Sequence, residues 1–340
     1  MKKETMSPPD INLLWERFTK GERRALSQMI TLIENQRPER RAEADLLLGR
    51  CLKIKPESVR IGISGAPGVG KSTFIEQLGL HTVHNNHRLA VLAVDPSSPV
   101  SGGSILGDRI RMEDLSRHPS AFIRPSPSGK HLGGVSRHTR ESILVCEAFG
   151  FDRIFIETVG VGQSEVDVAS MVDIFLILQQ PYTGDDIQGL KKGLLELADI
   201  IAVTKGDGEL LLPAKLTQQR LQNTLSLVHS LKPNDGTQLS ESGPLIFVVS
   251  GKTGDGIGEL AAALDQFIAR RKSSGQFTQK RINQSIAWFK SEIKEQLQDY
   301  FLKKPSIKHQ MDALELKIKQ SEAIPSLAAR ELIRTNLGSI

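Results

Sequence analysis

The chain has 340 residues, of which 39% are hydrophobic, so it is long enough to bury a sizeable core. Its 44 basic and 39 acidic residues give a net charge of +5, and no dense run of Lys and Arg is interleaved with aromatic residues. The two cysteines form no CxxC pair or Cys/His cluster, and no stretch of about 18 apolar residues occurs. We therefore expect a soluble cytoplasmic protein without a structural zinc site, with no nucleic acid and no membrane among its partners.

The first predicted block, residues 1–58, has the pattern of amphipathic helices. Four apolar residues recur at i, i+3, i+4 and i+7, a spacing that places them on one face of a helix. These residues are Leu26, Met29, Ile30 and Ile33. The first ten residues lack the apolar core of a signal peptide. We expect a helical N-terminal extension over 1–58.

The second predicted block, residues 59–272, alternates short apolar runs with helical segments. Six runs have the composition of strands, at 60–65, 89–95, 153–158, 174–179, 200–205 and 245–250. Continuous apolar runs separated by helices are typical of parallel strands that are covered on both faces. We therefore predict an α/β fold with a mostly parallel central sheet flanked by helices.

A phosphate-binding motif lies at 62–73, GISGAPGVGKST, which contains G-x-x-x-x-G-K-[ST] between a strand-like run and a helical segment. In this context the backbone N–H groups wrap a phosphate and the lysine reaches the terminal phosphates. The serine hydroxyl can bind Mg²⁺. The motif predicts a P-loop nucleotide site formed by Gly65, Ala66, Pro67, Gly68, Val69, Gly70, Lys71, Ser72 and Thr73.

Acidic residues at strand ends are the candidates to complete a Mg²⁺ site. Asp95 and Glu157 each close a predicted strand, and ligands of open α/β sheets lie at the carboxyl ends of the strands. The sequence ETVG at 157–160 has the form D-x-x-G with Glu in place of Asp, so the N–H of Gly160 is expected to sense the γ-phosphate. The alternative for Glu157 is an ordinary solvated strand end.

Two further motifs indicate the base. TKGD at 204–207 resembles N-K-x-D, in which the Asp accepts hydrogen bonds from N1–H and the exocyclic amine of guanine. SGK at 250–252 matches the S-A-K element, whose backbone contacts guanine O6. Adenine lacks this pair of donors, so GTP is favoured over ATP. The predicted base-binding residues are Thr204, Lys205, Asp207, Ser250, Gly251 and Lys252. Thr204 stands where the motif usually has Asn. The sequence does not show whether Thr204 makes the supporting hydrogen bonds of that Asn, but the contact from Asp207 to the base is unaffected.

The third predicted block, residues 273–340, returns to a helical pattern. Apolar residues step along it by three and four positions, with Lys and Glu between them, and such a stripe needs a partner surface. They are Ile282, Ile286, Phe289, Ile293, Leu297 and Tyr300. Two partners are open: the chain's own nucleotide domain, or a second copy of the chain that uses this block as a dimerisation arm.

The connection between the runs 89–95 and 153–158 is long and contains a helical segment at 136–149, which fits parallel neighbouring strands. Ras-like GTPases pair antiparallel strands at this point, so the chain is similar to the other branch of P-loop GTPases, whose members often assist metal or cofactor delivery. Four segments closely resemble the methylmalonyl-CoA mutase-associated GTPases of the MeaB type, also described as lysine/arginine/ornithine transport-system kinase or ATPase. These segments are AVDPSSPVSGGSILGDRIRM, FIRPSPS, ETVGVGQSE and GDDIQGLKKGLLELAD. The resemblance covers about residues 10–300.

The resemblance implies a homodimeric GTPase, with GTP/GDP and Mg²⁺, that serves as a chaperone for an adenosylcobalamin-dependent acyl-CoA mutase. Such chaperones gate cofactor loading and protect or reactivate the mutase. The resemblance also assigns metal-site and catalytic roles to Lys71, Asp95, Asp108 and Glu157, with Ser72 on the metal. It makes the segments 95–112, 159–165 and 184–193 switches, the last one communicating with the mutase.

No activating group can be assigned from the sequence. Gln163 stands three places after Gly160, whereas the Ras-like glutamine follows its glycine directly. No arginine finger can be assigned within the chain, although Arg109, Arg111 and Arg124 are available for that role. We therefore expect slow intrinsic turnover, on the order of 10⁻⁴ to 10⁻² s⁻¹, that rises when a partner organises the switches.

Two other functions remain as alternatives. A P-loop kinase or ATPase linked to lysine/arginine/ornithine transport would also use the phosphate motif, but it would usually bind ATP. A nickel or cobalt metallochaperone would carry a Cys- or His-rich motif, and this chain has no equivalent. His81, His84 and His87 lie where a helix is expected to end, which is an ordinary place for cationic residues.

Overall fold

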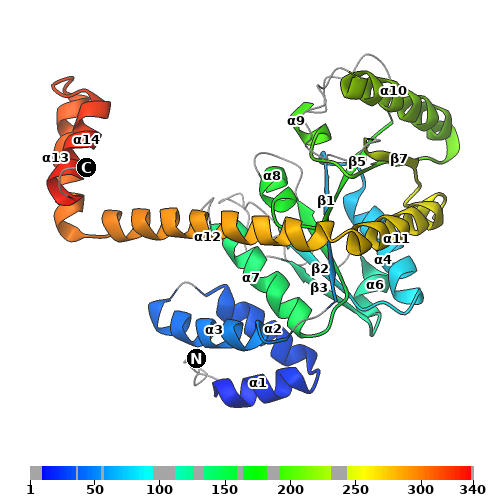
Figure 1. Cartoon of the computed structure of the whole chain (residues 1–340), viewed down its shortest axis with the longest axis horizontal. Coiled ribbons are helices and arrows are strands. Elements are labelled where there is room, and N and C mark those ends of the chain that lie inside the picture. The colour runs from blue at the N-terminus through cyan, green and yellow to red at the C-terminus, as the bar shows by residue number, and fades with distance from the viewer. Residues whose placement is uncertain are drawn as a thin grey trace, which may run out of the picture. The chain divides into compact units, whose positions relative to one another are not determined.

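A computed structural model describes residues 10–35, 37–54, 57–94, 112–125, 134–158, 164–181, 192–230 and 243–337 (Figure 1). The chain divides into two compact units, Met1–Thr278 and Gln279–Ile340. The finer division into blocks 1–58, 59–272 and 273–340 stays a prediction.

The first unit is built on a sheet of seven described strands in the order β3-β2-β4-β1-β5-β6-β7, and each neighbouring pair is parallel. The strands are β1 (Val59–Gly65), β2 (Leu89–Val94), β3 (Ala121–Pro125), β4 (Arg153–Thr158), β5 (Ile174–Gln179), β6 (Ile200–Val203) and β7 (Leu245–Val248). All six predicted strands are present and begin at or next to the predicted residue. The predicted α/β fold with a parallel sheet is confirmed.

The edge strand β3 was not predicted. It pairs in parallel with β2, with Leu89 opposite Ala121 and Ala93 opposite Pro125. The strand is short, and only its first three residues are apolar, so no clear run marks it in the sequence. Its terminal proline lacks an N–H group, which an edge strand tolerates. The predicted parallel pairing of β2 with β4 is confirmed, since Leu89 lies opposite Arg153.

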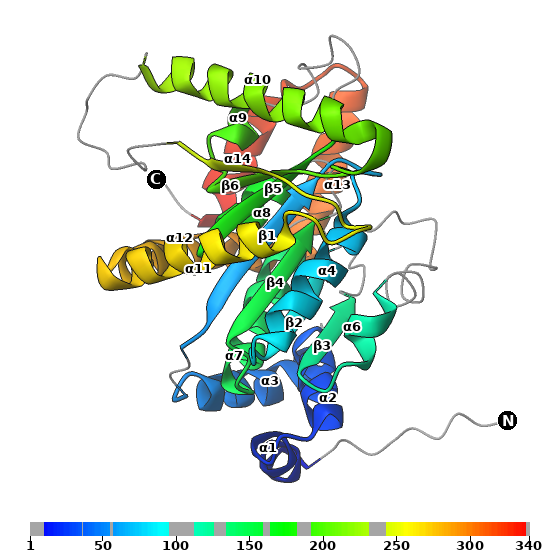
Figure 2. The same ribbon diagram turned by 90° about the vertical axis from the view of Figure 1, so that its right-hand side faces the viewer.

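Helices flank this sheet on both sides (Figures 1 and 2). Successive residues of a strand point to opposite faces of the sheet and so enter separate cores. In β2, Ala90 and Leu92 enter one core, while Leu89 and Val91 enter the other. Among the described residues of the unit, the helices and the 3-10 turn are α1 (Ile11–Thr19), α2 (Arg23–Ile33), α3 (Pro38–Cys51), α4 (Lys71–His84), α6 (Glu113–Arg117), α7 (Gly134–Ala148), α8 (Ser164–Ala169), α9 (Lys192–Leu195), η2 (Gly208–Leu210), α10 (Leu211–Ser230) and α11 (Ile257–Ser273).

The N-terminal helices pack on the sheet through α7. Both α2 and α3 contact α7, and the four residues of the predicted apolar face of α2 are fully buried in the core on that side. The helical prediction for this part of the chain is confirmed. One face of the sheet is therefore covered in two layers, first by α7 and then by α1–α3 (Figure 1).

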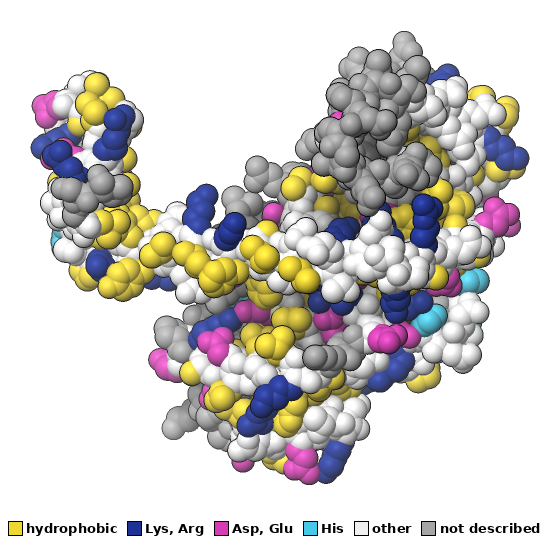
Figure 3. All heavy atoms as spheres, viewed as in Figure 1, with side chains coloured by type: hydrophobic (Ala, Val, Ile, Leu, Met, Phe, Trp, Pro, Cys, Tyr) yellow, Lys and Arg dark blue, Asp and Glu magenta, His cyan; other side chains and the backbone are white. Residues whose placement is uncertain are grey.

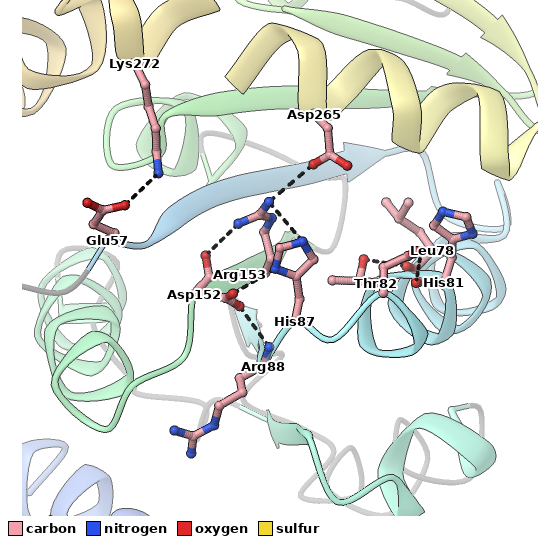
Figure 4. Close-up of polar contacts among 11 residues, drawn as sticks. Glu57, Leu78, His81, Thr82, His87, Arg88, Asp152, Arg153, Asp265 and Lys272 are labelled. Atoms are coloured by element: carbon pink, nitrogen blue, oxygen red, sulfur yellow. Dashed lines mark hydrogen bonds and ion pairs between the residues drawn. The ribbon is translucent and has the colours of Figure 1, made fainter. Parts of the chain in front are cut away.

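Polar side chains join β2, β4 and α11 at the amino ends of the strands, away from the phosphate loop (Figure 4). His87 Nδ1 lies 2.7 Å from Asp152 Oδ2, and Asp152 Oδ1 accepts a hydrogen bond from the N–H of Arg88. Arg153 Nη2 lies 3.3 Å from both His87 Nε2 and Asp265 Oδ1. Because a guanidinium only donates, His87 Nε2 accepts and Nδ1–H donates to Asp152. Within the described ranges, no group of three or more His, Cys, Asp or Glu side chains could hold a metal ion.

The second unit is helical. It contains most of α12 (Gln276–Leu302), together with α13 (Pro305–Lys319) and α14 (Pro325–Leu337), which pack against each other. The six apolar residues of the predicted stripe lie on α12 and are between 44% and 65% exposed. Figure 3 shows hydrophobic side chains gathered along this helix. No described helix of either unit is long and apolar enough to cross a membrane.

Candidate functional site

The phosphate loop joins the end of β1 to the start of α4. Gly68 (φ +78°) and Gly70 (φ +95°) adopt left-handed backbone conformations, which a residue with a side chain rarely takes. Gly70 is the N-cap of α4, and the first turn of this helix contains no acidic residue. The N–H groups and the positive end of the helix dipole are therefore available to an anion.

Lys71 folds over the loop that precedes it. Its Nζ donates to the carbonyl oxygens of Gly65 (2.8 Å) and Ala66 (3.2 Å). Burial lowers the pKa of Lys71, while the negative charges of Glu157 and Glu165 act to raise it. The two carboxylates thus help to keep the lysine protonated, the form that attracts phosphate.

Glu157 is the predicted strand-end acid that the structure places beside the loop. It is 8% exposed and stands opposite Ile63 in the pairing of β4 with β1. The next residue, Thr158, donates through Oγ1 to Ser64 Oγ at 2.8 Å and so joins the ends of the same two strands. Glu157 is buried against the phosphate loop and is not a solvated strand end.

Glu165 is a residue of this site that sequence reasoning missed. It lies in the first turn of α8, is 5% exposed, and its charge acts on Lys71. The helix α8 contacts both β1 and β4. In the sequence Glu165 fell within a predicted switch, and only the fold shows that this carboxylate is buried near the lysine.

The predicted base-binding segments meet the phosphate loop at one cavity of about 310 Å³. The residues that line it come from the loop and α4, from the segment after β6, and from the segment after β7. They are Val69, Gly70, Thr73, Phe74, Thr204, Lys205, Asp207, Leu210, Gly251 and Lys252. Of these, Phe74 and Leu210 were not predicted as site residues, because apolar side chains carry no recognisable motif.

Asp207 is oriented by Ser250. The fully buried Ser250 donates through Oγ to Asp207 Oδ1 at 2.7 Å. Ser250 Oγ in turn accepts hydrogen bonds from the N–H groups of Lys252 and Thr253, both at 3.1 Å. These bonds join the two predicted base motifs to each other. A carboxylate held in this way presents its other oxygen in a fixed direction.

Thr204 joins the base segment to the phosphate loop. Its Oγ1 lies 2.8 Å from the carbonyl oxygen of Val69 and 3.2 Å from that of Gln179. The next residue, Lys205, has a positive φ of 55°, a strained conformation for a residue with a side chain. Its Nζ lies 3.4 Å from Gln180 Oε1.

Several predicted residues lie outside the described residues. They are Asp95, Asp108, Arg109, Arg111, Gly160 and Gln163, together with most of the predicted switch segments. Arg124, the third available arginine, is described at the end of β3. Its Nη2 donates to Glu34 Oε2 at 2.6 Å and to Thr31 Oγ1 at 3.1 Å, both on or beside α2. The guanidinium of Arg124 is therefore engaged with the N-terminal helices.

Comparisons with known proteins agree with this site. The family model described as "Methylmalonyl Co-A mutase-associated GTPase MeaB" matches residues 26–306. "Probable GTPase Rv1496" of Mycobacterium tuberculosis (strain ATCC 25618 / H37Rv) is 44% identical over 92% of this chain and 91% of its own length. "Methylmalonic aciduria type A homolog, mitochondrial" of Mus musculus is 41% identical over 95% of this chain and 79% of its own length.

Two further relatives extend these comparisons. "GTPase ArgK" of Escherichia coli (strain K12) is 39% identical over 93% of each chain. Among solved structures, the one described as "LAO/AO transport system kinase" has a TM-score of 0.75 and 32% identity, and the match covers 98% of this chain and 99% of the other. The family match and these identities extend over most of the chain, so it belongs to the family of methylmalonyl-CoA mutase-associated GTPases and its ligand is a guanine nucleotide.

Proposed function

We propose that this GTPase is a chaperone of an adenosylcobalamin-dependent acyl-CoA mutase, with methylmalonyl-CoA mutase as the first candidate. In this role it gates cofactor loading and protects or reactivates the mutase. The observation that carries the proposal is the family match over residues 26–306, which spans the nucleotide site and most of the described helices around it. The name of the mouse relative, which refers to methylmalonic aciduria, supports the same class of partner.

Within the nucleotide site we assign phosphate binding to the loop 65–73 and catalytic roles to Lys71, Asp95, Asp108 and Glu157. The last three carboxylates and the hydroxyl of Ser72 would hold Mg²⁺, a hard cation that prefers oxygen ligands. The position of Glu157 supports this assignment, because it stands opposite Ile63 at the end of β4 and its charge acts on Lys71 of the phosphate loop. When bound, the metal would neutralise charge on the phosphates.

We assign base recognition to Asp207, with Thr204, Lys205, Ser250, Gly251 and Lys252, and contact with the γ-phosphate to Gly160. The hydrogen bond from Ser250 to Asp207 supports this part of the proposal, since it fixes an acceptor at the cavity. Guanine offers N1–H and an amine to such an acceptor, and adenine does not offer the same pair.

Turnover is expected to be slow without a partner. Arg124 is held by Glu34 on the N-terminal helices, so this arginine is not placed to stabilise charge on a transferring phosphate. An arginine finger accelerates related GTPases by about 10³ to 10⁵-fold, which leaves room for large activation by a bound mutase.

The experiment is co-purification with the cobalamin-dependent mutase of the same organism, with the GTPase rate measured with and without it. We expect a complex and a rate that rises at least tenfold when the mutase is added. A Lys71→Ala variant serves as the control for contaminating GTPases, because it removes the lysine that reaches the phosphates. Absence of both association and activation would refute the chaperone role.

A second candidate is a kinase linked to lysine/arginine/ornithine transport, which the description of the solved relative favours. A kinase requires an acceptor and usually ATP. Competition between ATP and GTP, followed by a test for phosphate transfer to these amino acids or to a protein, separates the two candidates. Equal affinity for ATP together with acceptor-dependent transfer would favour the kinase.

A further inference from the structure

The residue that departs from the usual N-K-x-D motif, Thr204, makes contacts that suggest a role of its own. It is 3% exposed, although it lines the cavity. Its Oγ1 lies within hydrogen-bonding distance of two backbone carbonyls, those of Val69 in the phosphate loop and Gln179 at the end of β5. Its N–H also donates to the carbonyl of Gln179, at 2.8 Å.

The hydrogen-bond inventory of a threonine limits what it can do for a base. A hydroxyl has one proton to donate, and both neighbours of Oγ1 are carbonyl oxygens, which only accept. The proton of Thr204 is therefore used within the protein. The N7 and O6 atoms of guanine are also acceptors and need a donor. Asparagine in this position would have two N–H groups on one nitrogen, enough to serve a carbonyl and a base atom together.

Gly206, in the rest of the base segment, packs against the end of β7 and the residue that follows it. The N–H of Gly206 donates to the carbonyl of Val249 at 2.9 Å. A Cβ atom on Gly206 would lie 2.5 Å from Val248 Cγ1, so the backbone there is packed directly against the strand. Among the described contacts, the bond from Thr204 to Val69 is the side-chain link between the two loops.

We propose that Thr204 is a positioning residue that sets the base segment against the phosphate loop and makes no bond to guanine N7. Selection of guanine then depends on Asp207, which Ser250 orients. This inference rests on the proposed assignment of the base to the cavity. It differs from that assignment because it gives position 204 no direct contact with the base.

The test uses the full-length protein and three nucleotides: GTP, 7-deaza-GTP, in which a C–H group replaces N7, and ITP, which lacks the exocyclic amine. Dissociation constants are measured for the wild type, Thr204→Val and Thr204→Ser. We expect Thr204→Val to raise the dissociation constants of GTP and 7-deaza-GTP by the same factor, on the order of tenfold, because the Val69 carbonyl loses its hydrogen-bond donor. Thr204→Ser keeps the hydroxyl that bonds to the Val69 carbonyl, so it should lose less affinity for both nucleotides than Thr204→Val does.

The preference for GTP over ITP separates positioning from a general loss of stability. If the base segment shifts, Asp207 no longer meets the exocyclic amine, so Thr204→Val should lose part of this preference and Thr204→Ser should retain it. If Thr204 had a merely structural role, Thr204→Val would raise the dissociation constants of GTP and ITP by the same factor. Thr204→Ala removes the same hydroxyl with a smaller side chain and is measured alongside, with the melting temperature of each nucleotide-free variant as the folding control.

The inference is overturned if Thr204→Val alters the ratio of the 7-deaza-GTP and GTP dissociation constants, since N7 would then be read at this position. It is also overturned if Thr204→Val and Thr204→Ala bind all three nucleotides as the wild type does. A wild type that binds ATP as tightly as GTP would instead refute the proposed base site, and that result is seen before any variant is made.

Discussion

Glu165 is the residue through which the pH dependence of nucleotide binding can be tested. Protonated Lys71 attracts phosphate, burial lowers its pKa, and the charge of Glu165 acts to raise it. The affinity for GTP should therefore be highest at neutral pH, where Lys71 is protonated, and fall as the pH rises through the pKa of the lysine. Glu165→Gln removes a charge that raises this pKa, so the loss of affinity should begin at a lower pH than in the wild type.

The measurement is the dissociation constant of GTP between pH 7 and pH 10 for the wild type and Glu165→Gln, with Glu165→Asp as the control that keeps the charge. If the affinity for GTP began to fall at the same pH in the wild type and in Glu165→Gln, Glu165 would not act on the lysine. The isosteric replacement limits packing effects, because Glu165 is buried.

Arg124 is predicted to contribute to stability and not to the chemical step. Its partner Glu34 is an acid of intermediate exposure whose pKa is raised by partial burial, while Arg124 acts to lower it. Arg124→Ala should lower the free energy of unfolding by roughly 1.5–3 kcal/mol at neutral pH, since a largely covered carboxylate loses its charged donor. The GTPase rate of the folded variant should stay within about threefold of wild type.

The sign of the pH effect follows from Glu34. The pKa of Glu34 is raised in the folded wild type and should rise further in Arg124→Ala, which lacks the nearby positive charge. In the variant, a protonated Glu34 therefore favours the folded state at acidic pH, and this stabilisation is lost as the pH rises towards neutrality. The destabilisation by Arg124→Ala should therefore shrink when unfolding is measured near pH 4.5 instead of pH 7. A Glu34→Gln, Arg124→Ala double variant should lack this pH dependence. A large loss of GTPase rate at unchanged stability would return Arg124 to the catalytic candidates.

At the scale of elements, prediction succeeded where the pattern is local. The strand–loop–helix around 62–73 and the apolar strands could be read from consecutive residues. The strand β3 has three apolar residues before Arg124, too few for a pattern, and its place at the sheet edge depends on pairing with β2. The bond between Thr204 and Val69 joins residues 135 positions apart, and no local pattern encodes such a contact.

The helix α6 is held by a side chain of another helix, which gives a test of how α4 supports its neighbour. Glu76 Oε1 on α4 accepts from the N–H groups of Asp114 and Leu115, in the first turn of α6. Because these N–H groups have no partner within the helix, Glu76 serves as its N-terminal cap. Glu76→Ala should lower the free energy of unfolding by about 1 kcal/mol, the usual effect of a lost cap.

Glu76→Gln keeps an acceptor oxygen and should lose less than half as much stability. Chemical denaturation gives the free energies, and amide hydrogen exchange at Asp114 and Leu115 reports the cap directly. Unchanged exchange at these two amides in Glu76→Ala would contradict the capping role.

At the scale of the whole molecule, the exposed apolar stripe of α12 calls for a partner. The stripe runs from Ile282 to Tyr300, and its six residues are at least 44% exposed in the single chain. Contiguous exposed apolar surface of this kind marks an interaction site, and the three-and-four spacing suits packing against another helix. We propose that the partner is a second copy of the chain, since the same stripe on two chains can pair with itself.

Phe289 is the largest side chain of the stripe that carries no polar atom, and at 64% exposure it should be buried only in a dimer. Phe289→Glu places a charge in the proposed interface, where burial is costly, so this variant should sediment as a monomer at concentrations where the wild type is a dimer. Gln298→Glu adds the same charge to an exposed position of α12 outside the stripe and should remain dimeric. Sedimentation equilibrium measures both, and GTP affinity should be unchanged because Phe289 is not among the residues that line the nucleotide cavity. A monomeric wild type at all concentrations would instead assign the stripe to the chain's own nucleotide domain, and Phe289→Glu would then lower its melting temperature.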